Sequence, residues 1–163
     1  MSDNLTLAIA PGTRELGIAV FSGFDLLCIG VKTIKHHKSE RNVLEETALI
    51  LKEIFQEFSI NAVVIKAVSQ YQKLSLVLDE VVERIKFECR RKKLQFAEIT
   101  IEQIKSELCK IGKPTQRKAF ETLLSVYPEL GRYWNRPNKW QNDYYAFLFS
   151  AVAVGIVFLK GLV

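Results

Sequence analysis

The chain has few cysteines and no pattern that would pair them. Its 163 residues contain three, Cys28, Cys89 and Cys109, which are widely spaced and form no Cys-x-x-Cys pair. Neither a disulfide framework nor a zinc site is therefore indicated. The N-terminal residues also lack a basic stretch followed by an apolar run, the signature of a secretion signal. We expect a protein of a reducing compartment, the cytoplasm.

The chain also has little that could span a membrane. Its longest uncharged segment, from Tyr144 to Leu159, has sixteen residues, whereas a spanning helix needs about 20. The segment is rich in alanine, serine and glycine, small residues that allow a helix to pack closely. We expect a buried core helix rather than a tail anchor, and no membrane partner.

Internal repeats, low-complexity tracts and flexible linkers are absent from the sequence. A length of 163 residues with 48% hydrophobic content fits a single domain, residues 1–163, with one substantial core. The 23 Lys and Arg residues exceed the 18 Asp and Glu residues, which gives a formal net charge of +5. This excess favours a polyanionic partner but does not identify one.

Hydrophobic periodicity predicts three strands followed by alternating helices and strands. Short apolar stretches predict strands at 5–10, 17–21, 26–34, 61–65 and 94–99. Apolar residues three and four apart predict helices at 41–58, 69–91, 101–109 and 115–127, with a last helix beginning near Asn142 and Asp143. We predict an α/β fold with a mixed five-stranded sheet, a three-stranded antiparallel meander plus parallel strands, and helices on both faces.

Four segments carry the most specific motifs. They are Leu7-Ala-Ile-Ala-Pro-Gly-Thr-Arg-Glu-Leu-Gly-Ile-Ala-Val; Val64-Ile65-Lys66; Ile104-Lys105 with Ile111-Gly112 and a helix carrying Arg117 and Lys118; and Trp140-Gln-Asn-Asp143-Tyr-Tyr-Ala146. In this order they resemble the RuvC-like Holliday-junction resolvase family, which has a ribonuclease H-like fold. Pro11, Gly12 and Gly17 match the family's Asp-Pro-Gly turn and the glycine of its next strand. The resemblance covers nearly the whole chain.

The resemblance implies a dimer that grips branched DNA and cuts it with Mg²⁺ held by four acidic residues. At the four matched positions this chain has Ala10, Lys66, Trp140 and Asp143, so a single acid remains. Mg²⁺ requires oxygen ligands, and two-metal cleavage needs carboxylates around both ions. An ammonium group at Lys66 would also repel the cation. We therefore predict no cofactor and no metal-dependent cleavage.

Two of these positions have more than one interpretation. Lys66 could supply the positive charge of the missing metal and hold a DNA phosphate. Equally, it could point from a strand end into water, as most lysines do. Asp143 could be a remnant of the catalytic site or simply the N-cap of the last helix. Glu15, in the turn before the second strand, is a poor candidate for a displaced metal ligand.

Basic residues in several segments could track a phosphate backbone. The candidates for binding nucleic acid are Lys66, Lys105, Lys113, Arg117, Lys118, Arg132, Arg136 and Lys139. A further basic cluster, from Arg84 to Lys93, ends the helix predicted at 69–91. The aromatic residues Tyr133, Trp134 and Trp140 could stack on unpaired bases or cover the core.

The sequence thus predicts a RuvC-like protein that recognises branched or structured DNA, as a homodimer, without metal-dependent cleavage. Two alternatives remain open. One is an active Mg²⁺-dependent junction endonuclease with a rearranged site, in which case Mg²⁺ is the cofactor. The other is a protein-interaction scaffold that keeps the fold without binding nucleic acid.

Overall fold

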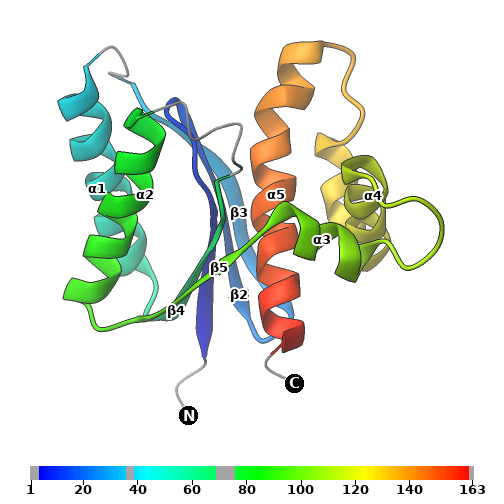
Figure 1. The fold of residues 1–163 in the computed structure, drawn as a ribbon, viewed down its shortest axis with the longest axis horizontal. Helices are drawn as coiled ribbons and strands as arrows, with labels where there is room; N and C mark the ends of the chain where they lie inside the picture. The colour runs from blue at the N-terminus through cyan, green and yellow to red at the C-terminus, as the bar shows by residue number, and fades with distance from the viewer. Residues whose placement is uncertain (1–3, 36–38, 69–75, 162–163) are drawn as a thin grey trace.

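The structure, a computed structural model, describes residues 4–35, 39–68 and 76–161, which fold into a layer of strands between two layers of helices (Figure 1). In chain order the elements are β1 (Leu5–Ala10), β2 (Glu15–Ser22), β3 (Asp25–Thr33), α1 (Glu40–Glu57), β4 (Ile60–Lys66), α2 (Leu76–Arg91), β5 (Gln95–Ile99), α3 (Ile101–Leu108), α4 (Gln116–Val126), the 3-10 helix η2 (Pro128–Tyr133) and α5 (Lys139–Gly161).

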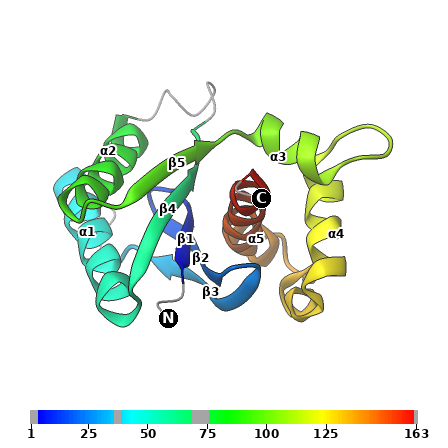
Figure 2. The same ribbon diagram turned by 90° about the horizontal axis from the view of Figure 1, so that it is seen from below.

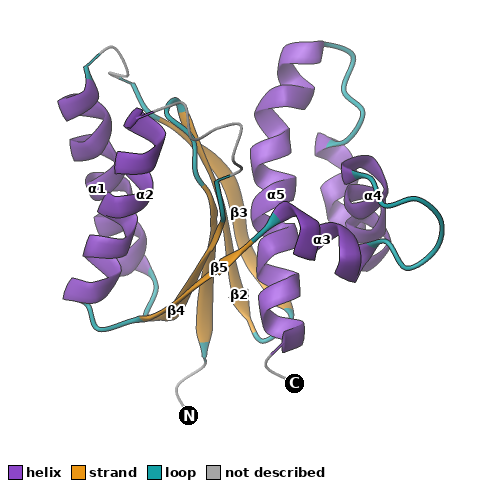
Figure 3. Ribbon diagram, viewed as in Figure 1, coloured by secondary structure: helices purple, strands orange, loops and turns teal. Residues whose placement is uncertain are grey.

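The described strands form a five-stranded sheet in the order β3-β2-β1-β4-β5. Antiparallel pairing joins β1, β2 and β3 into a meander, whereas β4 runs parallel to β1 and β5 runs parallel to β4. Helices α1 and α2 cover one face, and α3, α4 and α5 lie on the other (Figure 3). The predicted mixed five-stranded sheet with helices on both faces is confirmed. Because β1, β4 and β5 are parallel, their carboxyl ends lie at the same edge of the sheet.

The two faces of the sheet differ in the size of their side chains. Successive residues of a strand point to opposite faces, so Leu7 and Ile9 pack with the α1–α2 layer while Ala8 and Ala10 pack with α5. The same division holds on the neighbouring strands, where Ala19 and Ala62 belong to the α5 side. Small residues on this face let α5 lie close to the sheet (Figure 2).

Helix α5 rests on the sheet through two glycines. A Cβ atom on Gly17 of β2 would overlap the backbone carbonyl of Phe147, and one on Gly155 of α5 would overlap the ring of Phe21. Because glycine has no Cβ, the backbone of β2 can lie against the backbone of α5 at Gly17, and the Phe21 ring can lie against α5 at Gly155. The helix is apolar all round, and each residue from Leu148 to Leu159 is buried.

The expectation of a buried core helix is met by α5. By length and composition α5 could cross a membrane, but 67% of its most apolar window is buried inside the protein. A helix that is hydrophobic on every side needs such burial in a globular fold. In Figure 2, α5 lies between the sheet and α4, so it is the centre of its layer.

The bounds of α5, of α2 and of the loop after α4 differ from those predicted or are described only in part. The last helix begins at Lys139 rather than near Asn142, because its first turn forms on Asn138, whose carbonyl accepts from the amides of Gln141 and Asn142. The loop predicted after α4 contains the 3-10 helix η2, started by a proline at its first position. The first part of the helix predicted at 69–91, residues 69–75, lies outside the described residues, and α2 is described from Leu76.

Candidate nucleic-acid interface

Ala10 and Lys66 lie side by side where β1 and β4 end. Parallel pairing of Ile9 with Ile65 places the following residues, Ala10 and Lys66, next to each other on the face covered by α5. Asp143, in the second turn of α5, faces the same point. A pocket of about 240 Å³ is lined by Ala10, Pro11, Lys66, Ala67, Val68, Gln116, Asp143, Ala146, Phe147 and Ser150. The fold thus brings together three of the four positions that matched the family's acids.

The Lys66 side chain is half-buried in this pocket. Burial lowers the pKa of its ammonium group below the ordinary value, and the positive charge of Lys105 lowers this pKa further. Desolvation disfavours the charged form, and a like charge nearby adds to the effect. Lys66 therefore does not simply extend into water. An anion in the pocket would stabilise its charge.

Asp143 is a helix residue, not a helix cap. Its side chain is 69% exposed, and its carboxylate lies 3.9 Å from the Lys139 ammonium, one turn earlier in α5. The interpretation of Asp143 as the N-cap of the last helix is wrong, because that helix begins four residues before it. An exposed ion pair of this length contributes little to stability. The carboxylate is left at the rim of the pocket.

Magnesium does not fit this set of side chains. Asp143 offers one carboxylate, Ala10 offers no ligand and Lys66 brings a positive charge. Among the described residues, no group of three or more His, Cys, Asp or Glu side chains could hold a metal ion elsewhere. Glu15 begins β2 and does not line the pocket. No step of a metal-dependent reaction can be derived from these residues.

Trp140 is separate from the other three matched positions. It lies in the first turn of α5, its side chain is 66% exposed, and it does not line the pocket. Trp134, in contrast, packs on the core, with its ring 5.2 Å from that of Phe149 and 6.2 Å from that of Phe120. The aromatic residues considered together from the sequence therefore have different environments.

The candidate basic residues lie on the α3–α5 side of the sheet (Figure 1). Lys105 is the charged neighbour of Lys66, and Arg117 stands 5.6 Å over the ring of Trp134. Lys113 and Lys118 are exposed in the α3–α4 connection and the first turns of α4. Arg132, Arg136 and Lys139 are exposed around η2 and the start of α5.

The loop that carries Arg136 has a fixed conformation. The Asn142 side chain accepts from the Arg136 amide at 2.8 Å and donates to the Arg136 carbonyl at 2.9 Å. These two bonds hold the loop against the first turn of α5. Asn142 therefore connects the loop after η2 to α5, a role that its place near the predicted helix start did not reveal.

The basic cluster from Arg84 to Lys93 lies on the opposite face of the sheet, at the end of α2 (Figure 1). Some of its charges are already engaged: Lys86 lies 2.7 Å from Glu98, and Arg91 lies 3.4 Å from Glu88. Helix α2 and the Lys66 pocket lie on opposite faces of the sheet, and Lys86 reaches the edge strand β5 through its contact with Glu98. The cluster is set apart from the candidate interface.

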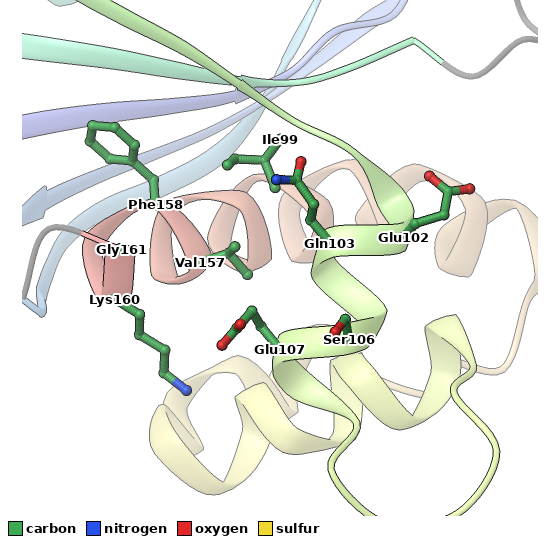
Figure 4. A pocket seen from close by; sticks show the side chains of 9 residues that line it. All are labelled: Ile99, Glu102, Gln103, Ser106, Glu107, Val157, Phe158, Lys160 and Gly161. Atoms are coloured by element: carbon green, nitrogen blue, oxygen red, sulfur yellow. The ribbon is translucent and has the colours of Figure 1, made fainter.

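A hollow of about 610 Å³ lies between α3 and the C-terminal end of α5 (Figure 4). Its charged lining residues are Glu102, Glu107 and Lys160, which leaves carboxylates in excess. Lys160 lies about 25 Å along α5 from Asp143, at ~1.5 Å of rise per residue. An acidic hollow at the far end of the helix is a poor continuation of a phosphate-binding surface.

Comparison with solved structures identifies the fold. Thermus thermophilus RuvC superposes with a TM-score of 0.75 at 15% identity, covering 97% of this chain and 95% of that one. T. thermophilus RuvC in complex with a Holliday junction substrate gives 0.73 at 14%, with 98% and 95% covered. The chain has the RuvC fold. The yeast mitochondrial Holliday junction resolvase Ydc2 shares it, with a TM-score of 0.62 at 9% identity over 97% of this chain and 84% of that one.

The predicted resemblance to RuvC is therefore confirmed at the level of the fold. No family model matches the sequence, and no curated protein matches it. The TM-scores establish the architecture. Sequence identities of 9 to 15% are too low to carry over a function, which must be argued from the side chains. In this RuvC fold, the pocket at the ends of β1 and β4 contains a lysine and one exposed carboxylate.

Proposed function

We propose that this chain binds branched DNA through the pocket around Lys66 and does not cut it. The observation behind the proposal is the pair of charged residues that line the pocket: Lys66 brings an ammonium group beside Ala10, and Asp143 brings a single carboxylate. A positive side chain next to a phosphate neutralises it without a metal ion. The same charge excludes the pair of cations on which hydrolysis depends.

The surface around the pocket supports a nucleic-acid partner. Exposed lysines and arginines in the α3–α4 connection, on α4, on η2 and at the start of α5 lie on the same side of the sheet as the pocket, and several separate cationic segments are what a phosphate backbone requires. Among the structures that share the fold, one is a RuvC bound to a Holliday junction substrate. A branched substrate is therefore the first one to test.

The proposal includes a homodimer. A four-way junction has pairs of equivalent arms, so two copies of the chain related by a two-fold axis could each place a pocket on one of them. Light scattering coupled to size exclusion should give twice the mass of the chain. The complex with a junction should contain two chains.

The test compares a labelled four-way junction with a linear duplex of the same sequence, each with Mg²⁺ and with EDTA. We expect tight binding to the junction, weaker binding to the duplex, equal junction affinity in both buffers, and intact strands after incubation with Mg²⁺. Binding would be followed by fluorescence anisotropy and strand integrity on a denaturing gel.

Other outcomes identify the alternatives. Strand cleavage in Mg²⁺ would establish an endonuclease with a rearranged site and overturn the proposal. An affinity for the junction that disappears in EDTA would mean that a metal ion is required after all. No binding of either DNA at low salt would favour a protein-interaction scaffold.

A further inference from the structure

A second pocket, rich in aromatic side chains, adjoins the pocket of Lys66. It has a volume of about 310 Å³ and lies between α4, η2 and α5, lined by Gln116, Arg117, Phe120, Tyr133, Trp134, Asn135, Asn142, Ala146 and Phe149. Gln116 and Ala146 line both pockets. The two pockets therefore adjoin each other, with Lys66 in one and Trp134 in the other.

The rings of Phe120, Phe149 and Trp134 pack against one another and form an apolar wall of this pocket. Phe120 and Phe149 are buried and stack on each other, with ring centroids 5.3 Å apart and planes inclined by 26°. Trp134 stands edge-on to both and is half-exposed. The tryptophan therefore covers part of the core and also presents its remaining surface to the pocket. Of the two interpretations drawn from the sequence, core cover is confirmed for this residue. The half-exposed ring leaves the stacking of a base as a prediction.

The polar groups at the rim match the edge of a nucleobase. The Arg117 guanidinium lies 5.6 Å over the Trp134 ring, so cation and aromatic surface are already arranged in layers. Gln116 and Asn135 are exposed amides, which can both donate and accept hydrogen bonds, as base edges do. The pocket thus combines an apolar wall with a cation and two amides at its rim.

We propose that this aromatic pocket takes one unpaired nucleobase of a DNA strand whose phosphate lies at Lys66. The inference rests on the proposed function and deepens it, because it names the part of the branched substrate that is recognised. A charged groove beside an aromatic surface is the arrangement by which proteins hold single-stranded nucleic acid. An unpaired base also enters a pocket at lower cost than a paired one.

The chain contains two tryptophans, so the variant Trp140→Phe makes Trp134 the single tryptophan, and excitation at wavelengths that tyrosine does not absorb makes its emission a reporter of the pocket. This variant would be titrated with a fully paired four-way junction, with a junction carrying one unpaired thymidine at the crossover, and with a short oligothymidylate. We expect the unpaired base to quench Trp134 emission. It should also raise the affinity about tenfold over the fully paired junction.

Two arginines offer a matched pair of substitutions. Arg117 and Arg132 are both exposed and each lies within 6 Å of an aromatic ring, but only Arg117 lines the pocket. Arg117→Ala should abolish most of the preference for the unpaired base. Arg132→Ala removes the same charge and should weaken both junctions equally, which leaves the preference intact.

The outcomes separate the two proposals. Junctions that bind with equal affinity and leave Trp134 emission unchanged at saturation would overturn the nucleobase pocket and leave junction binding intact. If neither junction binds, the proposed function fails. The oligothymidylate then tests the pocket alone, and unchanged emission with this strand would overturn it, whereas quenching that Arg117→Ala removes would support it.

Discussion

At the scale of single residues, Lys66 determines what the pocket can hold. Its neighbours across the strand pairing and on α5 are a buried alanine, Ala10, and an exposed aspartate, Asp143. The pKa of its ammonium group lies below the ordinary 10.5 because of burial and the charge of Lys105. A bound phosphate would offset both effects.

Removal of this charge should weaken DNA binding. Lys66→Ala should raise the Kd for a four-way junction about tenfold, as expected for one charge-assisted contact. Lys52→Ala is the matched control, because Lys52 is an exposed lysine on α1, beyond the opposite face of the sheet. Equal affinity of the two variants would contradict a phosphate site at Lys66.

The lowered pKa also gives a dependence on pH with a definite sign. As pH rises, Lys66 loses its proton at a pH below 10.5, and junction binding should weaken over that range. Lys66→Arg should remove this weakening, because a guanidinium with a pKa above about 12 stays charged. Anisotropy titrations across the alkaline pH range would measure the junction affinity of the unaltered protein and of Lys66→Arg. If both affinities decline equally with pH, Lys66 is not the group that causes the decline.

A change of the pocket's charge should convert it into a cation site. The double variant Ala10→Asp and Lys66→Glu places two carboxylates beside Asp143. Without metal these like charges, one of them at a position only 2% exposed, should cost about 3 kcal/mol of stability. Millimolar Mg²⁺ should recover much of this loss by binding the folded state. Thermal unfolding measures the melting temperature of the double variant with Mg²⁺ and with EDTA. The melting temperature of the unaltered protein should be the same in both buffers.

At the scale of elements, the contact between α5 and β2 determines the position of the site. Phe147 lies over Gly17 and also close to Gly12, where an added Cβ would meet the ring. The turn after β1 and the start of β2 are therefore both held by the same turn of α5, directly beside Ala10. A displacement of α5 would move Asp143 away from Lys66.

Gly17→Ala should consequently destabilise the fold. The new Cβ meets backbone rather than a movable side chain, so helix and strand must separate, at a cost of about 3 kcal/mol. Gly30→Ala, on the adjacent strand β3, is the control, since nothing lies within 4 Å of its added Cβ. Urea denaturation monitored by circular dichroism compares the two, and similar midpoints would mean that the close contact does not limit stability.

Different apolar patterns predicted the helices and the strands. Helices α1, α3 and α4 bury side chains three and four residues apart, whereas β1, β2 and β4 are apolar stretches that are buried along most of their length. The strands and these three helices were therefore predicted to within two residues. The start of α5 was missed because Lys139, Trp140, Gln141 and Asn142 form a polar first turn without apolar repetition. The η2 helix was missed for a similar reason, since one short 3-10 segment has no period to detect.

The candidate site was only partly predictable. Ala10, Lys66 and Asp143 could be grouped from motif order, because each falls at the end of a strand or the start of a helix in the expected topology. The aromatic pocket could not, since Phe120 and Phe149 come from two helices whose mutual packing is a tertiary contact. The roles of Gln116 and Asn142 likewise depend on the approach of α4 and η2 to α5.

At the scale of the whole molecule, the basic residues of the α3–α5 side should produce a strong dependence on salt. With about four phosphate contacts, the association constant should fall about a hundredfold between roughly 50 and 200 mM salt. The slope of the logarithm of the association constant against the logarithm of the salt concentration therefore gives the number of phosphate contacts.

Two charge-matched double variants test which side of the molecule is used. Lys113→Ala with Lys118→Ala should reduce that slope by about two contacts. Arg90→Ala with Lys92→Ala removes the same charge from the end of α2, on the opposite face of the sheet, and should leave the slope unchanged. A reversed result would place the DNA against α2.

The contact of Phe147 with Gly12 and Gly17 also bears on how such sequences are classified. A Pro-Gly turn followed by a glycine on the next strand groups this chain with RuvC by motif, yet the two glycines mark places where Phe147 of α5 leaves no room for a side chain. Within this short motif, Gly12 and Gly17 serve the packing of α5, whereas position 10 lies in the pocket and decides which ligand groups are available. A classification of activity within this architecture should therefore weigh residues 10, 66 and 143, which line one pocket, and disregard the glycines.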